Sequence, residues 1–182
     1  MFACAPRCPP SPSLTQHLRI QPVNPWTGYN WEIYNEYFQW SPENNINSAA
    51  HTVQPGDVLY GSVTYDKDSA SYMMYHVDET DGWSVNTTIP VQTDSSGNPK
   101  KFTMSYFVFE KSQWACDQYP TNEEVTFYDI NMEFDGEKVQ PKWTTAFVDD
   151  HCDFRASIVD EATIKMTWNT GANDDANLRG AK

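Results

Sequence analysis

The stretch Lys101–Pro120, KFTMSYFVFEKSQWACDQYP, alternates in a way that predicts one long β-strand carrying an acid, followed by a cysteine and a Tyr-Pro turn. Successive side chains of a strand point to opposite faces, so Tyr106, Val108 and Glu110 share one face, opposite the phenylalanines between them. Glu110 therefore ends a mostly apolar row, where loss of water contact would favour its protonated form and suit it to acid chemistry. The alternative is an ordinary surface acid at a wet strand end, since glutamate is usually exposed.

The rest of the chain repeats short alternating runs of apolar and polar residues, separated by turn signals such as Asp81-Gly82 and Asp135-Gly136. It has no helical periodicity of useful length, no internal repeat and no glycine-rich phosphate loop. This pattern predicts an all-β protein, a two-sheet antiparallel β-sandwich. The expected strands span residues 14–20, 29–40, 58–66, 71–77, 83–91, 101–110, 125–134, 139–148 and 156–169.

The domain organisation follows from length and composition. A chain of 182 residues can bury one core, and no internal linker is evident, so we expect a single domain over residues 14–170. Residues 1–13 are rich in Pro, Ser and Cys, which predicts a disordered leader outside the fold, and residues 171–182 form a polar tail. The first twenty residues lack the apolar core of a secretory signal, and no run is long enough for a membrane helix.

The charge of the chain limits its partners. The formal net charge is -13 and the sequence pI is about 4.5. The electrostatic field of this negative charge repels phosphate backbones and anionic lipid, so we expect neither nucleic acid nor membrane as a partner. An acidic working environment would fit, because protonation of surface carboxylates relieves their mutual repulsion.

The cysteines point to an oxidising compartment. Cys116 and Cys152 each follow an expected strand, which predicts a disulfide between them. The chain has no CxxC pair, and its four histidines are scattered, so we expect no metal site and no cofactor. Asn86 opens a glycosylation sequon, Asn86-Thr87-Thr88. These features together predict a secreted, extracellular protein.

Aromatic residues are concentrated in residues 26–40, where Trp31 and Tyr37 are expected on one face of a strand. Such rings could stack on a sugar or a peptide over a concave sheet, or they could simply fill the core. The patterns GxSxG and HExxH do not occur, and no cysteine has an evident catalytic histidine, so the common serine, metal and thiol hydrolases are not predicted.

Several segments, in their order and spacing from about Leu18 to Asn169, resemble the glutamic peptidases (eqolisins) and their uncharacterised relatives. The resemblance implies a concanavalin-like β-sandwich in which a glutamine and a glutamate on the concave sheet activate water for peptide hydrolysis. Gln21 matches the glutamine. The segments are RIQPVNPW, WEIYNEYFQW, PGDVLYGSVTYD, FVFE followed by a cysteine and Tyr-Pro, and PKW before a second cysteine.

The resemblance departs from the family at the acid. It places Tyr106 where the peptidases carry the catalytic glutamate, and Glu110 four residues later, at the position of a second acid. A tyrosine cannot replace a carboxylate as the base at acid pH. Either Glu110 has taken over the role, or the sandwich persists without proteolysis.

Three functions therefore stay open. The first is binding of a glycan or an extended peptide in an aromatic groove. The second is an acid-active glutamic-type peptidase that uses Gln21 and Glu110. The third is a structural extracellular protein that self-associates through exposed aromatic surface. The residues expected to line the groove are Trp31, Tyr37, Tyr106 and Val108.

Overall fold

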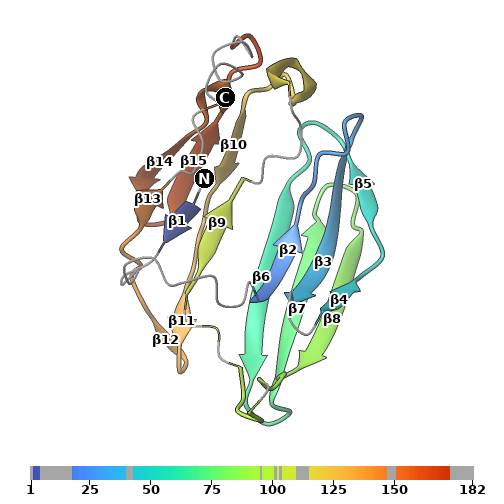
Figure 1. Cartoon of the computed structure of the whole chain (residues 1–182), viewed down its shortest axis with the longest axis vertical. Coiled ribbons are helices and arrows are strands. Elements are labelled where there is room, and N and C mark those ends of the chain that lie inside the picture. Colours follow the sequence, from blue (N-terminus) through green and yellow to red (C-terminus); the bar gives the residue numbers. More distant parts are fainter. Residues whose placement is uncertain are drawn as a thin grey trace, which may run out of the picture. The chain divides into compact units, whose positions relative to one another are not determined.

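The computed structural model describes residues 2–4, 18–39, 43–94, 96–100, 102, 104–109, 115–146 and 151–172. Within these ranges the chain is built of antiparallel strands, and its helical segments are two 3-10 turns, Cys116–Gln118 and His151–Asp153 (Figure 1). The expected all-β class is confirmed. In the same ranges, no helix has the length and apolar character needed to cross a membrane.

The chain divides into two compact units, Pro12–Lys101 and Met1–Ser11 with Phe102–Lys182. We call them the first and the second unit and describe each by itself. The expected boundaries of one domain over residues 14–170 stay a prediction.

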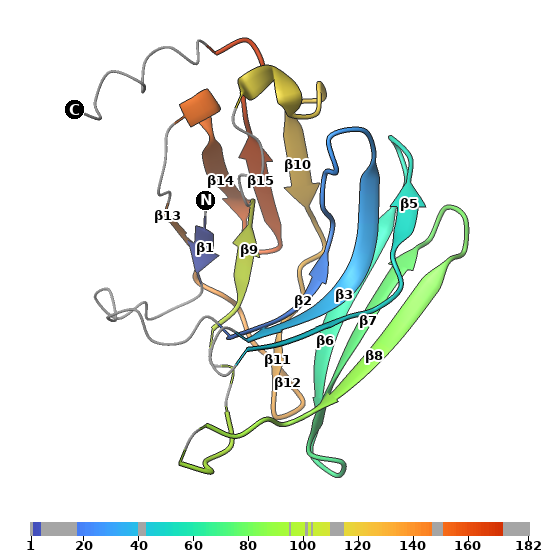
Figure 2. The same ribbon diagram turned by 45° about the vertical axis from the view of Figure 1, so that its right-hand side comes forward.

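The first unit contains two antiparallel sheets (Figure 2). In one sheet the order is β2-β3-β4, and β5 pairs with another part of β3. In the other sheet the order is β6-β7-β8. The strands are β2 (Leu18–Val23), β3 (Trp31–Gln39), β4 (Asn44–Asn47), β5 (His51–Val53), β6 (Leu59–Asp66), β7 (Ser71–Asp78) and β8 (Ser84–Pro90).

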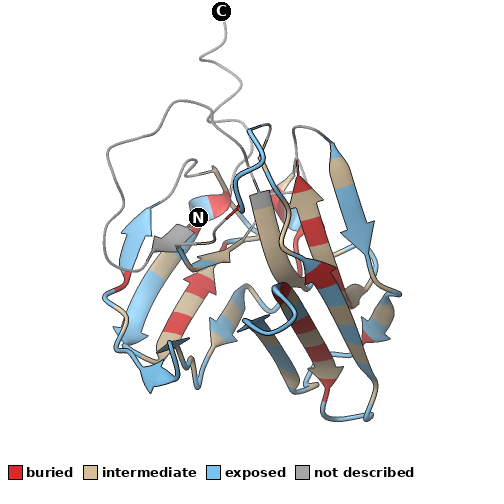
Figure 3. Ribbon diagram, turned by 90° about the horizontal axis from the view of Figure 1, so that it is seen from below, coloured by how far each residue is buried: buried red, intermediate tan, exposed pale blue. Residues whose placement is uncertain are grey.

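The two sheets of the first unit pack through alternate residues of β3. Ile33, Asn35 and Tyr37 are buried. The period of two in the sequence puts them on one face of the strand but does not say which face is buried. The Asn35 side-chain amide donates to the backbone oxygens of Met74 (3.1 Å) and Val85 (3.3 Å), so a polar group ties β3 to β7 and β8. Figure 3 shows buried positions alternating with more exposed ones along the strands.

Pro22 and Gly61 mark a close approach between β2 and β6. Pro22 lacks a backbone donor, and β2 lies at the edge of its sheet, as a proline requires. A Cβ atom added at Gly61 would lie 2.8 Å from the Pro22 Cβ, so only glycine leaves room for this contact.

The second unit is also made of antiparallel sheets and a hairpin. The orders are β13-β1-β9 and β10-β15-β14, and β11 pairs with β12 across the Asp135-Gly136 turn. The strands are β1 (Phe2–Cys4), β9 (Tyr106–Val108), β10 (Glu124–Phe127), β11 (Glu133–Phe134), β12 (Glu137–Lys138), β13 (Thr144–Ala146), β14 (Arg155–Asp160) and β15 (Thr163–Thr167).

The core of the second unit is aromatic and contains the disulfide. The Phe107 ring centroid lies 4.8 Å from that of Phe127, and the Phe109 centroid lies 4.8 Å from that of Trp168. Cys116 and Cys152 are buried in the same cluster as Trp168 and form the predicted disulfide, with their Cα atoms 5.4 Å apart.

Two expectations for the second unit were wrong. The strand expected over residues 101–110 is the three-residue β9 within the described residues, because its partner β1 pairs over three residues only. Phe2–Cys4, expected in a disordered leader, form β1 between β13 and β9.

Candidate functional site

Gln21 and Glu36 form a cross-strand pair on the sheet of β2 and β3. They are opposite each other in the antiparallel register, so their side chains share a face. The Gln21 Nε2 atom donates to Glu36 Oε2 at 2.8 Å, and both side chains are half-buried.

The Glu36 carboxylate sets which way the Gln21 amide points. When it is ionised it only accepts hydrogen bonds, so the nitrogen of the amide faces it and the oxygen faces away. Among the described residues, none donates to Gln21 Oε1. The amide therefore presents one acceptor and one remaining N–H in a set orientation.

Other groups on the same face of β3 add negative charge. Glu32, Tyr34 and Glu36 alternate along the strand, opposite the buried row. Burial, followed by the negative charges of Glu36 and Glu32, raises the pKa of the Tyr34 hydroxyl. Tyr34 stays protonated in neutral and acid solution and can donate a hydrogen bond there.

The aromatic residues expected in the groove lie on the other face of this sheet. Trp31 and Tyr37 lie on the same face of β3 as Ile33 and so point away from the Gln21–Glu36 face. The ring of Trp31 contacts that of Trp26, with centroids 5.5 Å apart. Tyr37 is 1% exposed and its hydroxyl donates to Gln39 Oε1 at 2.6 Å, so its ring packs in the core instead of facing a ligand.

The row that was expected to end in Glu110 faces outward in its described part. Tyr106 and Met104 are exposed and Val108 is half-buried, while Phe107 and Phe109 pack in the core. The Tyr106 hydroxyl donates to Met104 Sδ at 2.9 Å. Glu110 itself lies outside the described residues, so its part in a site stays a prediction.

His76 and Asn86 occupy contrasting positions. His76 is a packed core residue whose Nδ1 lies 3.2 Å from the Tyr34 backbone oxygen, and burial lowers its pKa, which favours the neutral ring. Asn86, the sequon residue, is exposed on β8, where its glycosylation stays a prediction.

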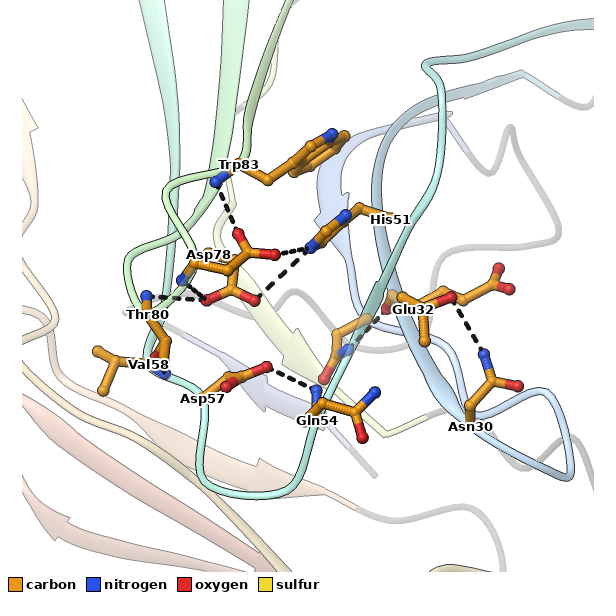
Figure 4. A network of polar contacts seen from close by, with 12 residues as sticks. Asn30, Glu32, His51, Gln54, Asp57, Val58, Asp78, Thr80 and Trp83 are labelled. Carbon is orange, nitrogen blue, oxygen red and sulfur yellow. Dashed lines mark hydrogen bonds and ion pairs between the residues drawn. The ribbon is translucent and has the colours of Figure 1, made fainter.

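A second polar cluster joins His51 to Asp78 and Asp81 (Figure 4). The sequence pattern does not indicate this cluster, because His51 is far from the two aspartates in the chain and the aspartates belong to an ordinary turn signal. Glu36 was missed for a similar reason: its pairing with Gln21 depends on the register of β2 on β3.

No family model and no curated protein matches the chain. Its structure is similar to that of aspergilloglutamic peptidase from Aspergillus niger, at 16% identity and a TM-score of 0.56, over 92% of this chain and 96% of that one. It is also similar to scytalido-glutamic peptidase in complex with a transition state analog inhibitor, at 16% identity and a TM-score of 0.53, over 92% of this chain and 81% of that one.

This chain has the glutamic-peptidase fold. The predicted β-sandwich and the resemblance in fold are therefore confirmed, at a sequence identity of 16%. Since one fold hosts many activities, the likeness does not assign a function to these residues.

Proposed function

We propose that this chain is a glutamic-type peptidase that hydrolyses peptide bonds in acid solution, with Gln21 and Glu110 as its catalytic residues. The single observation that carries the proposal is the Gln21 amide held at 2.8 Å by Glu36, which leaves its oxygen and one N–H available to a substrate. Similarity to glutamic peptidases over 92% of the chain supports it, including one structure with a peptide based transition state analog.

The chemistry assigns a separate task to each group. Gln21 Oε1 accepts a hydrogen bond from the attacking water, and the remaining Gln21 N–H donates to the oxyanion that forms on the carbonyl oxygen. By the resemblance, the Glu110 carboxylate takes the proton of the water as its oxygen bonds to the carbonyl carbon. The same carboxyl group then gives that proton to the leaving nitrogen as the C–N bond breaks. Glu36 positions Gln21 and does not touch the substrate.

A peptide-library digest at pH 3 to 4 with the full chain tests this function. We expect cleavage, and we expect Gln21→Ala and Glu110→Gln each to abolish it. The cleavage rate of the double variant should be no lower than that of either single variant, because the effects of residues that act as a unit are not additive. Glu32→Gln, a change of the same type on the same face of β3, serves as the control. Cleavage that persists in both single variants would overturn the proposal.

A second candidate is binding of an extended peptide or a glycan without cleavage. It is favoured by Tyr106, which the resemblance places at the acid position and which is 45% exposed. Retention on a peptide or glycan array without turnover at any pH, and its loss in Tyr106→Ala, would support this candidate over hydrolysis.

Secretion forms part of the proposal. The Cys116–Cys152 disulfide favours an oxidising compartment, and the exposed sequon residue Asn86 fits an extracellular protein. Mass spectrometry of the protein from its natural source would show an intact disulfide and a glycan on Asn86. Free thiols at both cysteines in that material would contradict it.

A further inference from the structure

Three side chains of types that bind metals meet at one place in the first unit, one from β5 and two from the end of β7 and the turn that follows it. His51 opens β5, Asp78 ends β7, and Asp81 lies in the turn to β8. His51 Nε2 lies 2.8 Å from Asp81 Oδ2 and 3.7 Å from Asp78 Oδ2, and the three ligand atoms all lie within 4.8 Å of one another. Figure 4 shows the His51 ring directed at the Asp78 carboxylate.

Asp78 supplies a buried oxygen that lacks a hydrogen bond. Its side chain is 1% exposed. Asp78 Oδ1 accepts from the backbone N–H groups of Thr80 (2.9 Å) and Asp81 (3.4 Å), whereas no described residue donates a hydrogen bond to Oδ2. Burying a carboxylate oxygen without a hydrogen bond costs free energy, and a cation bound to this oxygen would offset that cost.

The contact between His51 and Asp81 is short without being a hydrogen bond. Nε2 and Oδ2 are 2.8 Å apart, yet within the described part of the chain His51 Nε2 has no hydrogen-bond partner. A short distance between two ligand atoms that are not hydrogen-bonded to each other is expected when both atoms bind the same ion. Around a tetrahedral Zn²⁺ with bonds of about 2.0 to 2.2 Å, neighbouring donor atoms lie roughly 3.3 Å apart, between the two distances observed here.

Surrounding contacts hold the three ligand groups in place. The backbone N–H of Trp83 donates to Asp81 Oδ1 at 2.7 Å, which leaves Oδ2 to face His51. The Trp83 indole stacks on the His51 ring, with centroids 4.6 Å apart and planes 8° apart. Such partners orient metal ligands in proteins and restrict their motion. Asp81 is half exposed, which leaves a path for an ion to enter.

We propose that His51 Nε2, Asp78 Oδ2 and Asp81 Oδ2 bind a divalent first-row transition-metal ion, such as Zn²⁺, with water as a further ligand. One imidazole and two carboxylates suit Zn²⁺ or Mn²⁺, whereas Ca²⁺ takes six to eight oxygen ligands. Because β5 belongs to one sheet and the β7–β8 turn to the other, the ion joins the two sheets of the first unit and stabilises them. The proposal differs from the expectation of no metal site and does not depend on the proposed peptidase activity.

Titration of the chelator-treated full chain with Zn²⁺ at pH 7 tests the site. We expect one ion to bind per chain and to raise the melting temperature, and Co²⁺ to give a visible absorption spectrum. His51→Gln and Asp81→Asn should each weaken binding at least tenfold and remove the Co²⁺ spectrum. Glu79→Gln removes one charge from an exposed position in the same turn and should leave binding unchanged.

The variants separate this site from a simple ion pair. If His51 is protonated and merely pairs with the carboxylates, Asp81→Asn lowers the melting temperature while Zn²⁺ does not change it in either protein. That outcome, or Zn²⁺ binding that Asp81→Asn and Glu79→Gln weaken equally, would overturn the proposal. Asp81 is chosen over Asp78 because the buried Asp78 also anchors the turn, and its replacement would threaten folding.

Discussion

Gln21 and Glu36 lie opposite each other across β2 and β3, and the Gln21 amide nitrogen donates to the Glu36 carboxylate at 2.8 Å. The pair fixes the orientation of an amide that could otherwise rotate or flip. If Gln21 is catalytic, Glu36 is the residue that positions it.

Glu36→Gln should therefore lower kcat without unfolding the protein. A glutamine can offer its own N–H to Gln21 and so permits the flipped amide. We expect a decrease of about tenfold to a hundredfold in kcat, the range seen when a supporting hydrogen bond to a catalytic group is lost, with little change in KM. Steady-state kinetics across pH would measure this, with Glu32→Gln as the control. An equal loss in the two variants would indicate a general effect of charge.

Asn35→Ala should destabilise the first unit. Asn35 is fully buried, and its amide donates to the Met74 and Val85 backbone oxygens and contacts Thr87 Oγ1. Removing the amide deletes hydrogen bonds that are buried or part-buried, at a cost of about 1 to 3 kcal/mol in the free energy of unfolding. Chemical denaturation would measure the loss. Asn47→Ala on β4, where the side chain is exposed, should have almost no effect.

Loss of the Cys116–Cys152 disulfide should destabilise the second unit. The bond closes a loop with a sequence separation of 36. A loop of this length corresponds to about 3 to 4 kcal/mol, because the bond restricts the unfolded chain. Denaturation of the Cys116→Ala, Cys152→Ala double variant would measure the difference. A reducing agent should lower the denaturant concentration at the unfolding midpoint of the natural chain but should not change that of the double variant.

Glu123 should contribute to stability in a defined range of pH. Glu123 Oε1 accepts from the Thr170 hydroxyl (2.6 Å) and the Thr170 backbone N–H (2.7 Å), and these hydrogen bonds lower the pKa of the carboxyl. A lowered pKa in the folded state means that the contribution is present above the unfolded pKa and is lost as pH falls through the folded pKa. An NMR titration should show the Glu123 pKa rising in Thr170→Val. An unchanged pKa in that variant would contradict the assignment.

The sequence by itself determined the local features of this protein. Period-two alternation placed Trp31 and Tyr37 on one face of β3, although it did not say which face is buried. Pro22 lacks a backbone donor, which suits the edge position of β2. The placement of Cys116 and Cys152 after strands predicted their bond. These features can be predicted from the sequence because they depend on backbone geometry within one strand or turn.

Tertiary structure alone decided which side chains meet. The alternation of residues 102–109 separates two faces, but only packing against Phe127 and Trp168 makes the Phe107 and Phe109 face the buried one. Gln21 meets Glu36 through the register of β2 on β3, since a slip of one residue would turn the glutamine to the other face. His51 meets Asp78 because two sheets pack together. Register and packing are set by partner strands distant in sequence, and no pattern within one strand encodes them.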